Sequence, residues 1–146
     1  MKRGFVLLLL LALTPAPRPA LAQESEGYVV IVNASNETSE MAAGLVARIF
    51  LRKVRQWRGG LVAVPVDQSL ASPLRTGFSR QILGMTGGEV RAYWMKQTLS
   101  GGEIPPVVRS TERDVLEFVK TERGAISYVS AATKLPSEIK AVKVTQ

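Results

Sequence analysis

A short polar stretch after an apolar run contains the residues best suited to chemistry. Asp67 follows the run at residues 61–66, and Ser72 and Arg75 come soon after it. Their carboxylate, hydroxyl and guanidinium groups are polar side chains that can contact a ligand. Because Pro73 follows Ser72, the pair also marks a helix start, with serine at the N-cap and proline at the first helical position. The stretch therefore predicts a ligand site where a strand gives way to a helix.

A second polar group follows the first apolar run of the chain, at residues 28–32. Asn33, Ser35 and Asn36 lie directly after this run. In an open α/β sheet, ligands bind outside the carboxyl ends of the strands. If the strand before Asp67 is the neighbour of this one, we expect these three side chains to lie beside Asp67 and to contribute to the same ligand site.

Each of these residues also has a plainer interpretation. Ser72 can be an ordinary helix cap, and Arg75 a solvated helix charge. The asparagines and Ser35 are also common at strand ends for turn reasons alone.

Two residue types that carry much of enzyme chemistry are missing. The chain has no cysteine and no histidine, which excludes a Ser-His-Asp triad, a cysteine nucleophile and a conventional zinc site. It also contains no phosphate-binding P-loop and no G-x-G-x-x-G motif. These absences leave open an enzyme that relies only on carboxylates, lysine or serine, but they do not favour one. We expect a protein that is not an enzyme and that uses no cofactor or metal.

The first 22 residues have the pattern of a secretory signal peptide. Lys2 and Arg3 form a basic start, an apolar run covers residues 5–13, and residues 20–22 (Ala-Leu-Ala) match a cleavage site. The apolar run is too short for a membrane helix, which needs roughly 20 residues. We predict a signal peptide at residues 1–22, a single domain at residues 23–146, and a periplasmic or secreted protein.

The charge of the whole chain overstates how basic the predicted mature domain is. The net charge is +7 for the full sequence. Without Lys2, Arg3 and Arg18, 16 basic and 12 acidic residues remain, a net charge of +4. A mildly basic domain of this size gives no reason to expect a nucleic-acid partner.

Apolar runs and helical spacing alternate along the rest of the chain. The pattern predicts strands at residues 28–32, 61–66, 125–129 and 139–144, helices at 41–51, 72–83, 89–99 and 111–123, and a loop at 100–110. The first run is almost continuously apolar, which is typical of a strand buried on both faces in a parallel sheet. The order of elements predicts a three-layer α/β sandwich with a mostly parallel sheet.

Three segments together resemble the phosphate-type substrate-binding proteins of ABC transporters, which have the type II periplasmic-binding-protein-like fold. Residues 47–57 (ARIFLRKVRQW) are similar to the family's "IFLGK-two-residues-W", with Arg52 where the family usually has glycine. Residues 124–129 (GAISYV) resemble its "GAIGYV". Residues 66–78 occupy the place of its phosphate loop, "GSGT" followed by arginine. The resemblance covers most of residues 29–130.

The resemblance implies a fold, a ligand class and partners. In the family, the GSGT amides and an arginine hold phosphate. This chain keeps Ser72 and Arg75, but Pro73 has no N–H to donate and Asp67 stands where the family has its first arginine. Full-size members have two lobes that close on the ligand, and this chain corresponds to about one of them. The resemblance therefore implies an exported module for phosphate or another small oxyanion that serves an ABC transporter permease or a sensor.

A second hypothesis is a periplasmic interaction protein that kept the fold and lost the ligand. The altered phosphate loop favours it. A single lobe leaves its ligand face open, so we also expect pairing, as a homodimer or with another protein. Lys53, Arg55 and Arg58 form either a solvated turn or a patch for anionic lipid or a partner. Trp57, Tyr93 and Trp94 are expected to be packing aromatics rather than platforms that bind a sugar.

Overall fold

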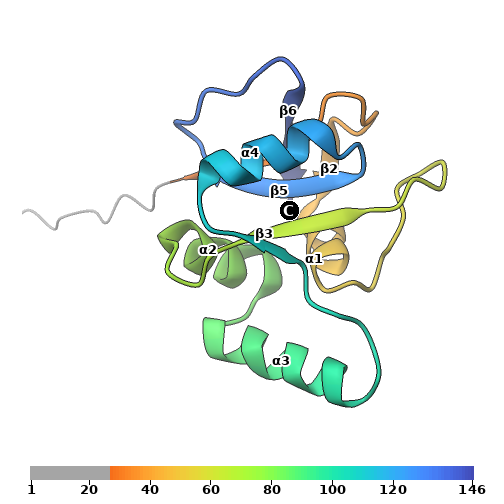
Figure 1. The fold of residues 1–146 in the computed structure, drawn as a ribbon, viewed down its shortest axis with the longest axis vertical. Helices are drawn as coiled ribbons and strands as arrows, with labels where there is room; N and C mark the ends of the chain where they lie inside the picture. The colour runs from red at the N-terminus through yellow and green to blue at the C-terminus, as the bar shows by residue number, and fades with distance from the viewer. Residues whose placement is uncertain (1–26) are drawn as a thin grey trace, which may run out of the picture.

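The computed structural model describes residues 27–146, which form a six-stranded sheet in the order β2-β6-β1-β5-β3-β4 with helices on both faces (Figure 1). The strands are β1 (Tyr28–Asn33), β2 (Glu40–Ala42), β3 (Val64–Gln68), β4 (Val107–Arg109), β5 (Ala125–Ser130) and β6 (Ile139–Thr145). The helices are α1 (Ala43–Phe50), α2 (Pro73–Phe78), the π-helical η1 (Ser79–Leu83), α3 (Gly87–Leu99) and α4 (Glu112–Thr121). The predicted signal peptide and its cleavage site lie outside the described residues. Within these residues, no helix is long and apolar enough to cross a membrane.

Every strand except β1 runs in the same direction. β3 is parallel to both β4 and β5, and β6 is parallel to β2. β1 lies between β5 and β6 and is antiparallel to both. The mostly parallel sheet is confirmed, but the parallel direction expected for the first strand is wrong. A central strand covered by helices on both faces is apolar throughout whichever way it runs, so its composition does not reveal its direction.

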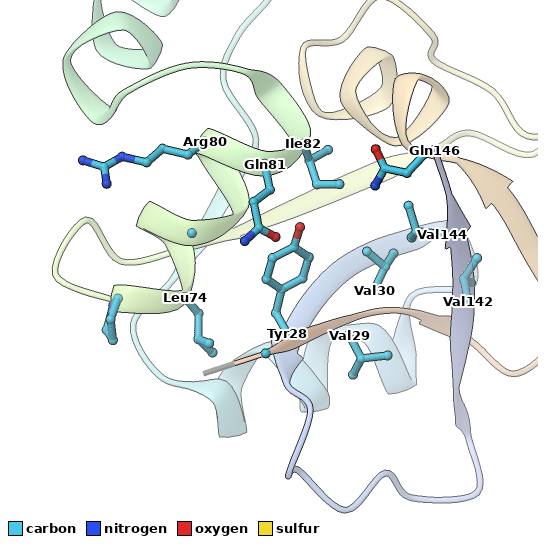
Figure 2. A pocket seen from close by; sticks show the side chains of 13 residues that line it. Tyr28, Val29, Val30, Leu74, Arg80, Gln81, Ile82, Val142, Val144 and Gln146 are labelled. Carbon is cyan, nitrogen blue, oxygen red and sulfur yellow. The ribbon is translucent and has the colours of Figure 1, made fainter. Parts of the chain in front are cut away.

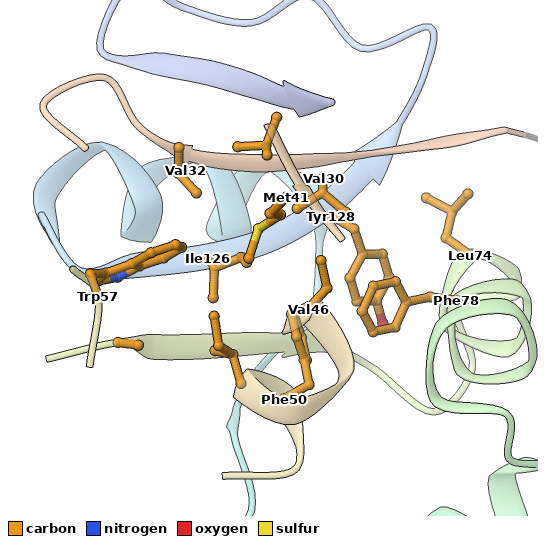
Figure 3. Close-up of a cluster of buried hydrophobic side chains, with 13 residues drawn as sticks. Val30, Val32, Met41, Val46, Phe50, Trp57, Leu74, Phe78, Ile126 and Tyr128 are labelled. Carbon is orange, nitrogen blue, oxygen red and sulfur yellow. The ribbon is translucent and has the colours of Figure 1, made fainter. Parts of the chain in front are cut away.

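Two apolar clusters, one on each face of the sheet, make the fold a three-layer sandwich. On one face, α1 and α2 cover β1 and β5, and the ring of Phe78 stacks on that of Tyr128 with centroids 4.0 Å apart (Figure 3). On the other face, Val115 and Val119 of α4 pack against Val129 of β5. Neighbouring residues of β5 point to opposite faces, as expected for a strand.

The element boundaries depart from the predictions in several places. β3 begins at Val64 and includes Asp67 and Gln68, which the sequence predicts to follow a strand at 61–66. Met41 lies in the short strand β2 rather than at the start of a helix, and α1 begins after it. The single helix predicted at 72–83 is divided into α2 and the π-helical η1. The edge strand β4 lies inside the predicted loop at 100–110. Strands of three residues at a sheet edge are too short to show a period-two pattern.

The end of α1 and the packing role of Trp57 agree with the sequence. α1 ends at its C-cap Leu51, as predicted, and Arg52 then has a positive φ of 59°. Glycine adopts this backbone region most easily, which explains why glycine suits this position in the substrate-binding-protein family that the segment resembles. Trp57 is buried, and its indole N–H donates to the carbonyl of Gly124 at 2.9 Å.

Helix α3 stands apart from the sandwich (Figure 1). Only Val90 of its 13 residues is buried. The hydroxyl of Tyr93 donates to the carbonyl of Leu51 at 3.0 Å and ties the helix to the end of α1. A capping box between Thr86 and Glu89 fixes its start. The Tyr93 hydrogen bond and the burial of Val90 therefore attach α3 to the body of the protein, and most of its surface is left free.

Candidate functional site

The carboxyl end of β3 carries a buried charged cluster, which we call the Asp67 end of the sheet. Asp67 is 6% exposed. Its Oδ2 lies 3.0 Å from Nη2 of Arg75, and its Oδ1 accepts hydrogen bonds from the Gln68 backbone N–H and from the Tyr128 hydroxyl. The predicted anion donor Arg75 thus already has a carboxylate partner inside the protein.

The cluster forms because three elements meet at this point. β3 and β5 are parallel neighbours, so Tyr128 on β5 lies near the end of β3. Arg75 projects from α2 back toward the same strand, and its Nη1 donates to the carbonyl of Gln68 at 2.7 Å. The Arg75 side chain is only 13% exposed, so the structure places it as a buried partner and not as a solvated helix charge.

The hydroxyl of Ser72 is also engaged within the protein. Ser72 occupies the N-cap position of α2, but its side chain makes no capping bond there. Its Oγ donates to Oε1 of Gln68 at 2.7 Å, and Nε2 of Gln68 donates to the carbonyl of Tyr128 at 2.8 Å. Pro73 begins the helix without an N–H, as the sequence indicates. Side chains, rather than the six-residue α2, therefore have to supply donors for any anion at this end.

Burial dominates the electrostatics of the Asp67 end. Burial raises the pKa of Asp67, while Arg75 and the hydrogen bonds from Tyr128 and Gln68 oppose the rise. Burial and the nearby carboxylate of Asp67 both raise the pKa of Tyr128 above its usual value. Tyr128 therefore stays a neutral donor, and ionised Asp67 cancels most of the charge that Arg75 would offer to a ligand.

The second predicted group lies at the opposite end of the sheet, which we call the Asn33 end. Nδ2 of Asn33 donates to the carbonyls of Val119 and Lys120, at 3.0 and 2.9 Å. Its Oδ1 accepts bonds from the backbone N–H and hydroxyl of Ser35. Asn36 is buried, and its Oδ1 accepts from the backbone N–H of Thr38 at 2.9 Å. This group closes a turn and satisfies the last carbonyls of α4.

The structure does not bring the two predicted groups together. β5 lies between β1 and β3, and β1 runs against both of them. Val32 pairs with Ile126 near the start of β5, so Asn33 lies near the end of the sheet where β3 begins. The expectation that Asn33 lies beside Asp67 is wrong, because it assumed neighbouring parallel strands. Ser35 and Asn36 follow Asn33 to that end.

Gln68 and Tyr128 are the members of the charged cluster that the sequence did not reveal. Tyr128 belongs to the GAISYV segment, but its partner Asp67 is 61 positions away. Only the adjacency of β3 and β5 joins them. Gln68 lies in the polar stretch that the sequence predicts to follow the strand, and in the structure it is the last residue of β3. Its backbone carbonyl and side chain nevertheless contact Arg75, Ser72 and Tyr128.

Two cavities flank α2. One, of about 890 Å³, lies over β1 and β6, where Val142 and Val144 form part of its floor (Figure 2). In this cavity the side chains of Tyr28 and Gln81 point toward each other (Figure 2). The other, of about 640 Å³, lies between α2 and α3 and has Arg75 in its wall. Within the described residues, no group of three or more acidic, cysteine or histidine side chains could hold a metal ion.

The fold is similar to that of solved phosphate-binding proteins. A protein from Clostridium perfringens, assigned as a phosphate ABC transporter substrate-binding protein and determined with bound phosphate, matches 81% of this chain with a TM-score of 0.64 and 19% identity. An ABC-type phosphate transport receptor from Vibrio cholerae also matches 81% of it, with a TM-score of 0.63 and 15% identity. PstS from Borrelia burgdorferi matches 80% of it, with a TM-score of 0.62 and 11% identity.

The match covers only part of each solved protein. This chain spans 44% of the Clostridium protein and 46% of each of the other two. No family model matches the sequence, and no curated protein is significantly similar to it. At identities this low the likeness is one of fold: this chain has the α/β architecture of a substrate-binding-protein lobe.

Proposed function

We propose that this chain is an exported, non-catalytic substrate-binding module that takes a small anion, phosphate or another oxyanion, at the Asp67 end. The observation that carries the proposal is Arg75: a largely buried cation at the end of β3, oriented by the Gln68 carbonyl and paired with Asp67. A guanidinium has more N–H donors than these two contacts use. An anion can therefore approach Arg75 while Asp67 remains bound or as it is displaced.

Asp67 sets the strength of this site. A carboxylate roughly 5 Å from a singly charged anion opposes binding by about 3 kcal/mol at an effective dielectric constant near 20. Protonation of Asp67 removes this repulsion, and its raised pKa makes protonation easier than for an exposed aspartate. Ser72 can add its hydroxyl if it turns away from Gln68. We therefore expect weak anion binding at neutral pH and stronger binding in mild acid.

Fold similarity and the signal-peptide pattern support the wider role. The solved proteins of this fold are described as phosphate transport receptors and substrate-binding proteins. We propose that the module works outside the cytoplasm after cleavage at residue 22, and that an ABC transporter permease or a sensor receives the bound anion. A homodimer is a further possible arrangement, because the open face of one lobe can be covered by another.

Isothermal titration calorimetry with phosphate and with sulfate tests the site. Sulfate keeps its charge between pH 5 and 8, so a change in its affinity reports on the protein. Asp67→Asn should bind both anions at least tenfold more tightly than the unaltered protein at neutral pH, given the repulsion that it removes. Asp67→Asn combined with Arg75→Ala should lose the gain. Asp114→Asn, at an exposed position on α4, is the matched control and should change nothing.

The proposal fails if Asp67→Asn folds normally and binds neither anion. The second candidate function, an interaction protein that kept the fold and lost the ligand, would then lead. Two observations favour that candidate: Ser72 and Arg75 already bond within the protein, and large apolar side chains are exposed around α3. In that case a partner protein, and not an anion, would protect the module against thermal unfolding.

A further inference from the structure

The groove between α3 and the body of the protein has the size of a ligand site. Its volume of about 640 Å³ lies within the range of roughly 300–1,000 Å³ that is usual for small-molecule sites. One wall is α3, and the other is formed by α2, the start of η1, the loop that follows β3, and β4. α3 stands off from the sandwich on this side (Figure 1). All of the lining residues belong to the described part of the chain.

The walls of the groove are largely apolar and exposed. Val90, Trp94 and Met95 line it from α3, and Leu70 and Val108 line it from the body. Met95 is 56% exposed, Leu70 62% and Val108 48%. Three more large apolar side chains are exposed nearby: Leu99 at the end of α3, Ile104 in the following loop, and Val107 in β4. Exposed apolar side chains gathered in one place usually mark a binding surface.

The charged side chains that line the groove are both positive. Arg75 and Arg91 line it, together with the hydroxyl groups of Ser69, Thr98 and Ser110. Among the described residues that line it, none is acidic. Arg91 forms no ion pair within residues 27–146. Arg75 is already paired with Asp67, so Arg91 is the cation that, together with these hydroxyl donors, is complementary to a negatively charged group.

We propose that this groove binds an amphipathic organic anion, with its apolar body against Trp94 and Met95 and its carboxylate or sulfonate at Arg91. A bare oxyanion would leave the apolar walls exposed, and a neutral apolar molecule would leave Arg91 without a partner. A second copy of the chain fits the charges less well. An isologous pairing through the groove sets two basic rims against each other.

The inference shares Arg75 with the proposed function but does not depend on it. It stands on the groove and on Arg91, which lies on a different helix from Ser72 and apart from Asp67. Decanoate is a suitable probe, because it joins a carboxylate to an apolar chain. Decanol has the chain without the charge, and acetate has the charge without the chain. All three are used below the micelle concentration of decanoate.

Tryptophan fluorescence of the full chain follows the titration. The chain has two tryptophans; Trp57 is buried in the core and Trp94 lines the groove. Decanoate should change the emission at least tenfold more effectively than decanol or acetate. Trp94→Phe should remove the change. Calorimetry should then still detect decanoate binding to the Trp94→Phe variant, since phenylalanine keeps an apolar wall.

Three variants locate the ligand. Arg91→Ala should weaken decanoate binding by about tenfold, the size of one charge-assisted hydrogen bond, and leave decanol binding unchanged. Met95→Glu places a negative charge on the apolar wall and should weaken decanoate by more than about tenfold through like-charge repulsion. Leu45→Glu, at an apolar position of α1 that is 38% exposed, is the matched control and should behave like the unaltered protein.

Several results would overturn the inference. Equal affinity for decanoate and decanol would mean an unspecific apolar surface, and unchanged decanoate binding by Met95→Glu would place the ligand elsewhere. A dimer in light scattering that Met95→Glu converts to a monomer would make the groove an interface between copies. Phosphate binding without decanoate binding would overturn only this inference. Decanoate binding that requires Arg91, without phosphate binding, would overturn only the proposed function.

Discussion

The two ends of the sheet carry polar clusters that resemble each other in sequence and differ in use. Each follows an apolar strand and combines short polar side chains with turn residues. At the Asn33 end, the amide of Asn33 donates to two carbonyls of α4 and its oxygen accepts from Ser35. At the Asp67 end, Asp67 forms an ion pair with Arg75. Tyr128 donates a hydrogen bond to Asp67, the Gln68 carbonyl accepts one from Arg75, and Arg75 also lines a groove.

The difference shows what separates a structural polar cluster from a candidate site. Asn33 is neutral, and the backbone and Ser35 engage its donors and its acceptor, so this side chain has no capacity left for a ligand. The Nδ2 of the neighbouring Asn36 is buried and has no hydrogen-bond partner within the described residues, but it carries no charge. The Asp67 end contains two charges, and a guanidinium keeps free donors after its two contacts. A polar residue after a strand therefore says little about binding until its partners are known.

The largest expected effect comes from breaking the ion pair. Arg75→Ala should lower the free energy of unfolding by about 3–5 kcal/mol, because it leaves the carboxylate of Asp67 buried without a cation. Both side chains are largely shielded, with 13% and 9% exposure. Urea denaturation at neutral pH measures the loss. Arg91→Ala removes an exposed arginine and should cost less than about 0.5 kcal/mol. If the two variants are equally stable, the Arg75–Asp67 ion pair contributes no more to the free energy of unfolding than an exposed surface charge does.

A smaller loss is expected at the Asn33 end. Asn33→Ala should cost about 1–3 kcal/mol, since two buried carbonyls at the end of α4 lose their donor. Asn33→Asp keeps the acceptor for Ser35 but turns a carboxylate toward those carbonyls, so it should cost at least as much. Hydrogen exchange in the last turn of α4 should become faster in both variants. Unchanged exchange in that turn would contradict the capping role of Asn33.

The positive φ of Arg52 allows a paired test near the Asn33 end. Nη1 of Arg52 donates to the carbonyl of Ala63, where β3 is about to begin. Arg52→Gly and Arg52→Ala both lose this bond, but only glycine adopts a φ of 59° without strain. The glycine variant should therefore be more stable than the alanine variant by about 1 kcal/mol. Equal melting temperatures would mean that the backbone relaxes at this position.

The last prediction concerns how stability changes with pH. Because burial raises the pKa of Asp67, the native state holds this proton more tightly than the unfolded chain does. The resulting stabilisation is complete below the unfolded pKa, and it is lost as the pH rises through the native pKa. The stability of the unaltered protein relative to Asp67→Asn should therefore fall as the pH rises from below the unfolded pKa of an aspartate, about 3.9, through the native pKa. Denaturation curves of both proteins at several pH values measure this slope, and the opposite slope would mean that Arg75 outweighs burial.

Local signals in the sequence were sufficient for most of the fold. The apolar runs placed four strands, helical spacing placed the helices, and the end of α1 at Leu51 followed from where a charged residue would otherwise enter the apolar face. The three-layer sandwich with a mostly parallel sheet followed from the order of the elements. The sequence also predicted the apolar run of β1 and the polar residues at the ends of β1 and β3. Burial and turn preferences act on residues that are close in the chain, so they leave a local pattern.

Tertiary structure alone decided the rest, because it depends on which strands are neighbours and which way they run. β1 is apolar because it is central, and that burial is the same for either direction, so only the pairing with β5 and β6 sends Asn33 to the far end of the sheet. The partnership of Tyr128 with Asp67 likewise requires β5 beside β3. The groove exists because α3 stands off from α2. Contacts between residues far apart in the chain leave no periodic trace in the sequence, and both candidate binding surfaces of this protein are built from such contacts.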